Sequence, residues 1–187
     1  MREALTTARL TLRPPVPADG AAHAAMHADP EVMAHFQATL EGDAHAAFMA
    51  RAQAHRERHG FGFWTVERRS DGAVAGLVGL LVPTFEAPFT PCVEISWRLA
   101  RPFWGKGYAL EAAAACLAFG FEDLALEEIV GFTVPANRRS WRLMEQLWMV
   151  RDPADDFDHP NLPTGHPLRR HVLYRRRAAA WRRHSPG

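Results

Sequence analysis

A glycine-flanked turn that runs directly into a helix-forming segment constrains this chain more than any other feature. The turn is Trp104–Ala109 (WGKGYA), and the segment after it is Leu110–Ala115 (LEAAAA). Glycine lets the backbone approach a ligand closely, and the first amides of a helix point outward without intrahelical partners at the positive end of the dipole. The turn also holds Lys106, the single lysine of the chain. The pattern therefore predicts an anion-binding loop.

The segments on either side of the turn predict strands. Cys92–Leu99 (CVEISWRL) alternates apolar and polar side chains, and Glu128–Val134 (EIVGFTV) is an apolar run that ends at Pro135. Two nucleotide-binding motifs share this order of elements, but neither is present. Gly107 follows the lysine where a P-loop needs Ser or Thr, and Leu110 stands where a dinucleotide-binding loop has its third glycine.

The remaining segments predict an α+β protein without internal repeats, and its length predicts a single domain of residues 1–187. The loop Asp152–Pro167 is rich in Pro, Asp and His, and we expect it to be structureless and to form one wall of the substrate site. The other expected elements are a strand at Leu10–Arg13, helices at Pro17–His27 and Gly42–His59, a hairpin of Phe61–Arg68 and Ala73–Val82, a helix starting near Asn137 and a strand at Leu168–Arg175.

Charge and cysteine content limit the class of protein. A formal net charge of +1 gives no general attraction to nucleic acid, and we expect the arginines between Arg169 and Arg183 to form a solvated strand and tail. Cys92 and Cys116 lack the spacing of a redox or metal site and predict buried thiols in a reducing compartment. No apolar run reaches membrane-spanning length, and the first six residues lack signal-peptide character, so we expect a cytoplasmic protein without membrane contact.

The histidines do not predict a metal site. His23 and His27 lie four residues apart on an expected helix, but no His-Glu-x-x-His pattern accompanies them. We therefore expect surface or pocket histidines there. His159, His166 and His171 are expected to line the substrate pocket or to cap loops.

Four segments resemble the GCN5-related N-acetyltransferases, the GNAT family, and in particular the branch that includes the ribosomal-protein N-terminal acetyltransferases. They are Ala8–Pro14 (ARLTLRP), Val93–Leu99 (VEISWRL), Pro102–Ala112 (PFWGKGYALEA) and Pro135–Ser140 (PANRRS), in the family's order. The resemblance implies the GNAT fold, a central, mostly antiparallel mixed sheet with splayed central strands, flanked by helices.

Two positions depart from the family pattern. Pro102 stands where the pyrophosphate motif often begins with Gln or Arg. Trp148 stands where the helix after Asn137 commonly ends in glycine. A tryptophan with a positive φ angle costs about 1 kcal/mol, so we expect this helix to end differently.

The resemblance implies an acetyl-CoA-dependent N-acetyltransferase, in which a primary amine attacks the thioester carbonyl. The strand before the glycine turn would pair with the pantetheine arm, the turn would bind the pyrophosphate, and the start of the next helix would contact pantetheine. The residues assigned to acetyl-CoA are Trp97, Arg98, Leu99, Trp104, Gly105, Lys106, Gly107, Tyr108, Ala109, Asn137 and Ser140.

Two residues are candidates for catalysis. Glu94 lies on the polar face of its strand and is the first candidate for the base that takes the amine proton; a water chain and an exposed or ion-paired glutamate are the alternatives. The family often places a tyrosine donor for the leaving thiolate where this chain has Met144, so Ser140 is the candidate donor. Asn137 is a pantetheine contact or simply a helix N-cap.

The acceptor amine is left open. A protein N-terminus, a polyamine, an amino acid and an aminoglycoside all suit the scaffold, since the fold does not fix the function. An acidic pocket drawn from Asp152–Asp158 would favour a cationic small molecule. A ribosomal protein as partner, a homodimer, and a non-catalytic acyl-CoA-binding regulatory domain are further alternatives.

Overall fold

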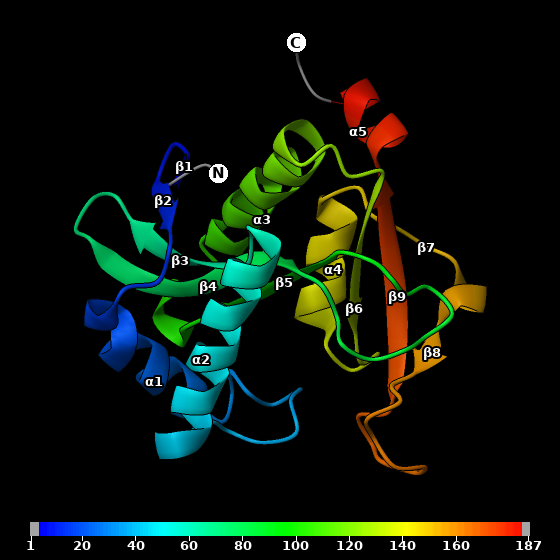
Figure 1. The fold of residues 1–187 in the computed structure, drawn as a ribbon, viewed down its shortest axis with the longest axis horizontal. Helices are drawn as coiled ribbons and strands as arrows, with labels where there is room; N and C mark the ends of the chain where they lie inside the picture. The colour runs from blue at the N-terminus through cyan, green and yellow to red at the C-terminus, as the bar shows by residue number, and fades with distance from the viewer. Residues whose placement is uncertain (1–3, 185–187) are drawn as a thin grey trace. The chain divides into compact units, whose positions relative to one another are not determined.

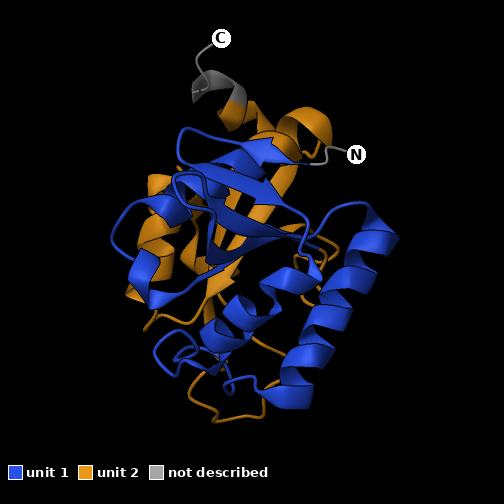
Figure 2. Cartoon of the chain, turned by 90° about the vertical axis from the view of Figure 1, so that its left-hand side faces the viewer, with its two compact units in different colours: residues 1–81, 96–116 blue, residues 82–95, 117–187 orange. Residues whose placement is uncertain are grey.

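The computed structural model describes residues 4–184, and of residues 182–184 the backbone only. Contacts divide the chain into two compact units, shown in Figure 2. Unit 1 comprises Met1–Leu81 and Ser96–Cys116, and unit 2 comprises Val82–Ile95 and Leu117–Gly187. Strand β5 and helix α3 each begin in one unit and end in the other, and we describe each unit by itself.

Unit 1 contains an antiparallel sheet, which can be followed in Figure 1. Leu12 lies opposite Val66, and Phe63 opposite Gly79. The turn at Asp71-Gly72 joins the predicted hairpin, which is confirmed within two residues. The strands, in sheet order, are β1 (Leu5–Thr6), β2 (Leu10–Arg13), β3 (Phe63–Arg68), β4 (Ala73–Leu81) and the end of β5 (Glu94–Leu99).

The helices of unit 1 agree with their predicted positions. A 3-10 turn, η1 (Pro17–Asp19), leads into α1 (Gly20–Ala28), and α2 (Gly42–His59) has the predicted bounds. A second 3-10 turn, η2 (Arg101–Phe103), precedes α3 (Tyr108–Ala118). Met26, Phe63 and Leu77 form a buried apolar cluster against which α2 packs Phe48, Met49 and Ala52.

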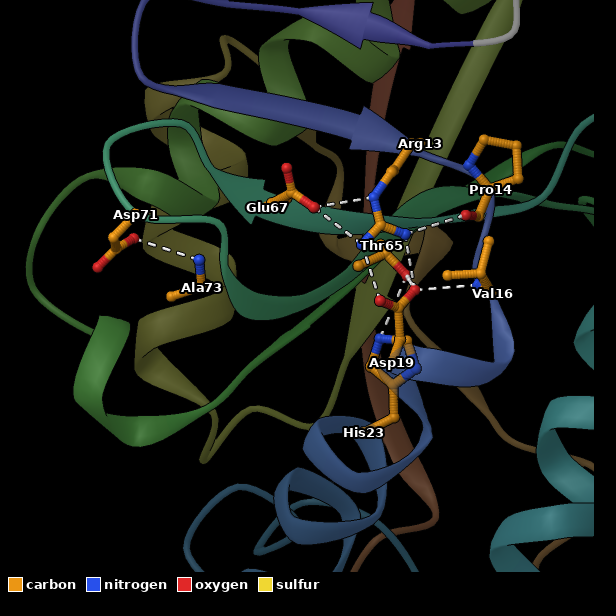
Figure 3. Close-up of polar contacts among 9 residues, drawn as sticks. All are labelled: Arg13, Pro14, Val16, Asp19, His23, Thr65, Glu67, Asp71 and Ala73. Carbon is orange, nitrogen blue, oxygen red and sulfur yellow. Dashed lines mark hydrogen bonds and ion pairs between the residues drawn. The ribbon is translucent and has the colours of Figure 1, made fainter.

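A buried polar network joins β2 and β3 to η1 and α1, as Figure 3 shows. Arg13 donates to both carboxylate oxygens of Asp19 at 2.8 Å, and Thr65 donates to Asp19 at 2.9 Å. Burial alone would raise the pKa of Asp19, but the bonds from Arg13, the Val16 amide and Thr65 outweigh it and lower that pKa to about 2. Because the Thr65 proton goes to Asp19, His23 Nε2, 3.3 Å from Thr65 Oγ1, must be the protonated nitrogen.

The prediction of surface or pocket histidines at positions 23 and 27 is wrong. His23 is 1% exposed and His27 is 0% exposed. His27 Nδ1 lies 3.0 Å from His45 Nδ1, and its Nε2 lies 3.2 Å from Arg98 Nη1. Burial lowers the pKa of His23 to about 4 and that of His27 to about 3, so both rings are neutral at pH 7. No group of three or more metal-ligating side chains occurs in residues 4–181.

Unit 2 contains one parallel strand pair and otherwise antiparallel pairs. Glu94 of β5 lies opposite Val130 of β6 (Glu128–Thr133) in the parallel register, and the Val130 amide donates to the Val93 carbonyl at 2.9 Å. Strand β9 (Arg170–Arg177) pairs with β6, and two short strands, β7 (Val150–Arg151) and β8 (Phe157–Asp158), pair with β9. The sheet is therefore mixed and mostly antiparallel, as expected.

Helices and aromatic rings complete unit 2. The end of α3 continues as a π-helical turn, Phe119–Asp123, and the predicted helix after Asn137 is α4 (Arg138–Gln146). A terminal helix, α5 (Ala178–His184), was not predicted. Val130, Phe157 and Leu173 form the core cluster, against which Phe85, Phe89, Cys92 and Phe132 pack. Cys116, in unit 1, is fully buried and Cys92 is half-buried, and both are free thiols.

Two expectations for the later chain are wrong. The segment Asp152–Pro167 is not structureless, because it holds a 3-10 turn, η4 (Pro153–Asp155), and strand β8. The helix α4 does end at the family's position: Trp148 has φ 58°, its amide donates to the Glu145 carbonyl at 2.9 Å, and the Met149 amide donates to the Met144 carbonyl at 3.0 Å. These bonds form a Schellman motif with tryptophan in the place of glycine.

The basic C-terminal segment is only partly solvated. Arg175 forms ion pairs with Glu128 and Asp155, and Arg176 is 4% exposed and donates to the carbonyls of Trp148 and Ala180. The side chains of Arg182 and Arg183 lie outside the described residues. Within residues 4–184, no helix is both long and apolar enough to cross a bilayer.

Candidate active site

The predicted anion loop is an exposed turn with two left-handed glycines. Gly105 has φ 70° and Gly107 has φ 77°, a region that side chains rarely adopt. The first backbone bond of α3 runs from the Glu111 amide to the Gly107 carbonyl at 3.1 Å. The amides of the preceding turn therefore have no helical acceptor, and their positions suit an anion.

One positive charge at this turn has no described carboxylate partner. Lys106 is exposed and forms no ion pair with any described residue, whereas Arg9 is paired with Glu111 and Arg68 with Asp71. The guanidinium of Arg9 lies 4.7 Å from the Tyr108 ring centroid, and that of Arg68 lies 5.1 Å from the ring of Phe103. Pro102 lies in η2 just before the turn, where it needs no amide donor.

The end of β5 packs closely on β4 in unit 1. The Ala100 amide donates to the Ala75 carbonyl at 2.9 Å, and a Cβ on Gly76 would lie 2.1 Å from the Arg98 carbonyl. This approach requires glycine at position 76. The indole of Trp104 donates to the Leu99 carbonyl at 2.7 Å, so that carbonyl already has a protein partner.

The side chain of Arg98 contacts aromatic rings of unit 1. Its guanidinium lies 4.1 Å from the ring centroid of Phe36 and 4.7 Å from that of Phe48. Together with the contact to His27, these interactions give the Arg98 side chain a packing role. Trp97, next to it on β5, is half-buried.

Glu94 lies at the start of β5, in unit 2, and is half-buried. Burial, followed by the negative charge of Glu94, raises the pKa of the Cys92 thiol to about 11. The Cys92 thiol is therefore protonated at neutral pH.

The start of α4 places Asn137 and Ser140 one turn apart. The Asn137 side chain accepts from the Ser140 amide at 3.3 Å and donates to Thr133 Oγ1 at 3.0 Å, so it is an N-cap. The Ser140 hydroxyl is half-buried and bonds to no described residue. It remains available to a ligand.

Helix α4 contains no tyrosine among its described residues that could serve as the family's proton donor. Met144 is 1% exposed and its sulfur would lie 3.3 Å from a Cβ on Gly131, so it belongs to the core. Tyr174, on β9, donates to Glu145 at 3.2 Å, and burial raises its pKa. Ser140 is thus the hydroxyl that α4 offers.

The carboxylates of the segment Asp152–Asp158 have protein partners. Asp155 pairs with Arg175 at 2.7 Å, Asp156 with Arg151 at 2.5 Å, and Asp158 with Arg169 and Arg170 at 3.2 and 3.4 Å. Asp152 accepts from the Ala154 amide. His159 and His166 accept from the Asn161 and Leu168 amides, as expected of loop caps.

Sequence reasoning missed two residues at the anion loop, Arg9 and Glu111. Arg9 Nε donates to Glu111 Oε2 at 2.6 Å. Both residues lie in segments that carry the family resemblance, but nothing in the sequence signals that positions 102 residues apart form a pair. Glu111 has a lowered pKa, because the bonds from Thr7 and Arg9 outweigh the effect of burial.

Comparison with known proteins agrees with this geometry. The family model of the acetyltransferase (GNAT) domain matches residues 9–150. The FsC-acetyl coenzyme A-N(2)-transacetylase of Aspergillus fumigatus is 37% identical over 89 residues, which are 46% of this chain and 37% of that protein. The chain thus matches well under half of that relative.

Solved structures share the fold over nearly the whole chain. The acetyltransferase of Agrobacterium tumefaciens superposes with a TM-score of 0.75 at 27% identity, over 94% of this chain and 95% of that one. The spermidine N-acetyltransferase of Vibrio cholerae, solved with CoA and spermine, superposes with a TM-score of 0.74 at 18% identity, over 94% and 99%. At that identity the second likeness concerns the fold alone.

Proposed function

Because the chain belongs to the GNAT family of acetyltransferases, which use acetyl-CoA as co-substrate, we propose that it acetylates a primary amine at the N-terminus of a protein. One observation carries the choice of acceptor. Three aspartates of the segment Asp152–Asp158 are paired with arginines, and the fourth accepts from a backbone amide. A polyamine or aminoglycoside needs unpaired carboxylates to neutralise its several charges. A single N-terminal amine needs fewer.

The glycine turn is the proposed site for the pyrophosphate. The left-handed Gly105 and Gly107 let the backbone approach, the amides before Glu111 supply donors, and Lys106 supplies charge. Tyr108 and Ala109 open the helix, and the Trp104 indole fixes the turn to the Leu99 carbonyl. The backbone of Trp97 is the proposed partner of the pantetheine arm, since the Arg98 carbonyl lies against Gly76 of β4.

Glu94 and Ser140 are the proposed proton-handling residues. Acetyl-CoA supplies an activated acyl group, and the acceptor amine must lose a proton to become the nucleophile. Glu94 is the proposed base, directly or through water. Ser140, whose hydroxyl has no described partner, is the proposed donor to the departing sulfur, and Asn137 orients it through the cap at the Ser140 amide.

The remaining proposals concern the protein as a whole. We propose one acetyltransferase domain over residues 1–187, since the family match includes residues of both units. The free thiols of Cys92 and Cys116 suit the cytoplasm. The branch resemblance makes a ribosomal protein the first partner to test, and a homodimer is the quaternary state to test beside a monomer.

The experiment is an acceptor panel with acetyl-CoA, in which thiol release measures turnover. The panel holds peptides that begin with Ala or Ser and contain one internal lysine, the same peptides with a blocked N-terminus, spermidine, free amino acids and an aminoglycoside. We expect turnover on the open peptides and none on the blocked ones. Turnover on spermidine or the aminoglycoside alone would refute the acceptor, and CoA binding without any turnover would support the non-catalytic alternative.

A further inference from the structure

We propose that Arg9 is a positioning residue for acetyl-CoA, which acts together with Glu111 to hold the turn Gly105–Ala109 in the conformation that receives the pyrophosphate. This inference rests on the proposed function, because it takes the turn to be the pyrophosphate site. It assigns a role to the segment Ala8–Pro14, to which the proposed mechanism gives none.

Arg9 makes three hydrogen bonds to the turn and to the helix that follows it. Its amide and its Nε donate to the two carboxylate oxygens of Glu111, at 2.8 and 2.6 Å, and its Nη1 donates to the Lys106 carbonyl at 2.9 Å. Its guanidinium also lies over the ring of Tyr108. One side chain therefore connects the middle of the turn to the first residues of α3, and it fixes the direction in which the turn's amides point.

The pair also resolves a conflict of charge. Glu111 lies in the first turn of α3, where a free carboxylate stabilises the helix but would repel an incoming phosphate. Thr7 Oγ1 donates to Glu111 Oε1 at 2.6 Å, in addition to the two bonds from Arg9. The carboxylate is thus turned to Thr7 and Arg9 and neutralised, which leaves the positive field of the helix start to the ligand.

Gly107 fits against Arg9. A Cβ built on Gly107 would lie 3.2 Å from Arg9 Nη2 and within 4 Å of no other group, whereas a Cβ on Gly105 would meet nothing. Position 107 therefore needs glycine for two reasons, the left-handed backbone and the guanidinium beside it. The arginine and the glycine occupy complementary space.

Hydrogen bonds from Arg69 hold the backbone of the segment that carries Arg9. The Arg69 amide donates to the Arg9 carbonyl at 2.9 Å, and Arg69 Nη1 donates to the carbonyls of Thr7 and Ala8 at 3.0 and 3.1 Å. Arg9 thus extends from a segment that the end of β3 holds in place. A side chain on a fixed base can restrict a glycine turn, which would otherwise be free to sample many conformations.

The test measures binding of three ligands by calorimetry, and it needs no acceptor. CoA carries the pyrophosphate and the 3′-phosphate, dephospho-CoA carries only the pyrophosphate, and pantetheine carries neither. The variants are Arg9→Gln, Arg9→Lys and Glu111→Gln. Arg51→Gln, an exposed arginine of α2 without a described partner, is the control for the same loss of net charge.

Arg9→Gln should weaken CoA and dephospho-CoA by the same factor, about tenfold for a charge-assisted contact, and leave pantetheine unchanged. Arg9→Lys should recover little, because an ammonium cannot hold Glu111 and the Lys106 carbonyl in one planar fork. Glu111→Gln should weaken CoA about threefold, since the amide keeps one acceptor. Thermal unfolding of each variant checks that the protein folds.

Distinct outcomes overturn this inference and the proposed function. If wild type binds CoA and Arg9→Gln binds it equally well, the role of Arg9 is wrong and the proposed function stands. A loss that disappears with dephospho-CoA would place Arg9 on the 3′-phosphate, and tighter CoA binding by Glu111→Gln would make that carboxylate merely repulsive. Both results contradict the proposal. Failure of wild type to bind CoA would refute the proposed function itself.

Discussion

Helices α3 and α4 begin in opposite ways. α3 follows a turn with two left-handed glycines, and its first-turn carboxylate, Glu111, is turned to Arg9 and Thr7. α4 begins at Asn137, whose side chain accepts from the helix amide at Ser140. The first start leaves its amides to a ligand, whereas the second has already satisfied one of them within the protein. The proposed anion site therefore lies at the start of α3, and the start of α4 offers the Ser140 hydroxyl.

Glu94→Gln should produce the largest effect and test whether chemistry is separate from the binding turn. Loss of a general base lowers kcat roughly 100-fold. The affinity for acetyl-CoA should stay within about twofold of wild type, since Glu94 lies outside the turn proposed to bind the pyrophosphate. Stopped-flow kinetics with a reactive acceptor, over a range of pH, measures both quantities.

Glu86→Gln is the matched control for the loss of one carboxylate, because Glu86 is exposed in the connection before β5 and has no described partner. It should behave as wild type. A full rate for Glu94→Gln would show that another group takes the proton of the acceptor amine.

Gly107→Ala should produce the next largest effect, on binding rather than on rate. A left-handed alanine costs about 1–2 kcal/mol, and its Cβ would also press on Arg9 Nη2, so the dissociation constant of acetyl-CoA should rise about tenfold. Gly105→Ala has a similar φ angle without that contact and should weaken binding less.

Gly165→Ala controls for backbone strain alone. Gly165 has φ 83° with open space around its Cα, and its segment, Asp152–Pro167, is expected to face the acceptor rather than acetyl-CoA. This variant should lose stability without losing affinity. Equal affinities of Gly107→Ala and wild type would show that the turn does not approach the ligand.

Local sequence patterns explain the predictions that the structure confirms. The glycine turn, the Asn-x-x-Ser cap and the bounds of α2 depend on residues within one or two turns of each other, and the structure confirms them. Alternation of apolar and polar residues located β5, and an apolar run ending at Pro135 located β6, each within two residues.

Contacts between distant residues account for what the sequence did not predict. The pair of Arg9 with Glu111 and the burial of His23 against Thr65 join segments that only the fold brings together. Strand β8 has two residues and exists because β9 pairs with it. Trp148 takes a positive φ because the Schellman bonds and the buried Met149 outweigh a strain of about 1 kcal/mol.

Ser140→Ala should have a smaller effect on the rate than Glu94→Gln. Serine is a weak acid, so its loss should lower kcat roughly tenfold, below the usual range for general acids, and should raise the KM for acetyl-CoA less. Because the hydroxyl bonds to no described residue, the free energy of unfolding should change by less than about 0.5 kcal/mol. Normal kinetics together with normal stability would reduce Ser140 to an ordinary residue of α4.

Asn137 gives the smallest expected effect and the finest test of the contrast. Asn137→Ala removes the cap of α4 and should lower the free energy of unfolding by about 1 kcal/mol, measured by denaturant titration. Asn137→Asp keeps the acceptor for the Ser140 amide but loses the donor that now bonds to Thr133. If Asn137 is a cap alone, Asn137→Asp should restore the stability and the acetyl-CoA affinity that Asn137→Ala loses. The Asn137 side chain would then have no part in ligand binding. If Asn137→Asp restores stability while affinity stays reduced, the amide itself contacts pantetheine, and the start of α4 binds ligand through a side chain where the start of α3 binds it through the backbone.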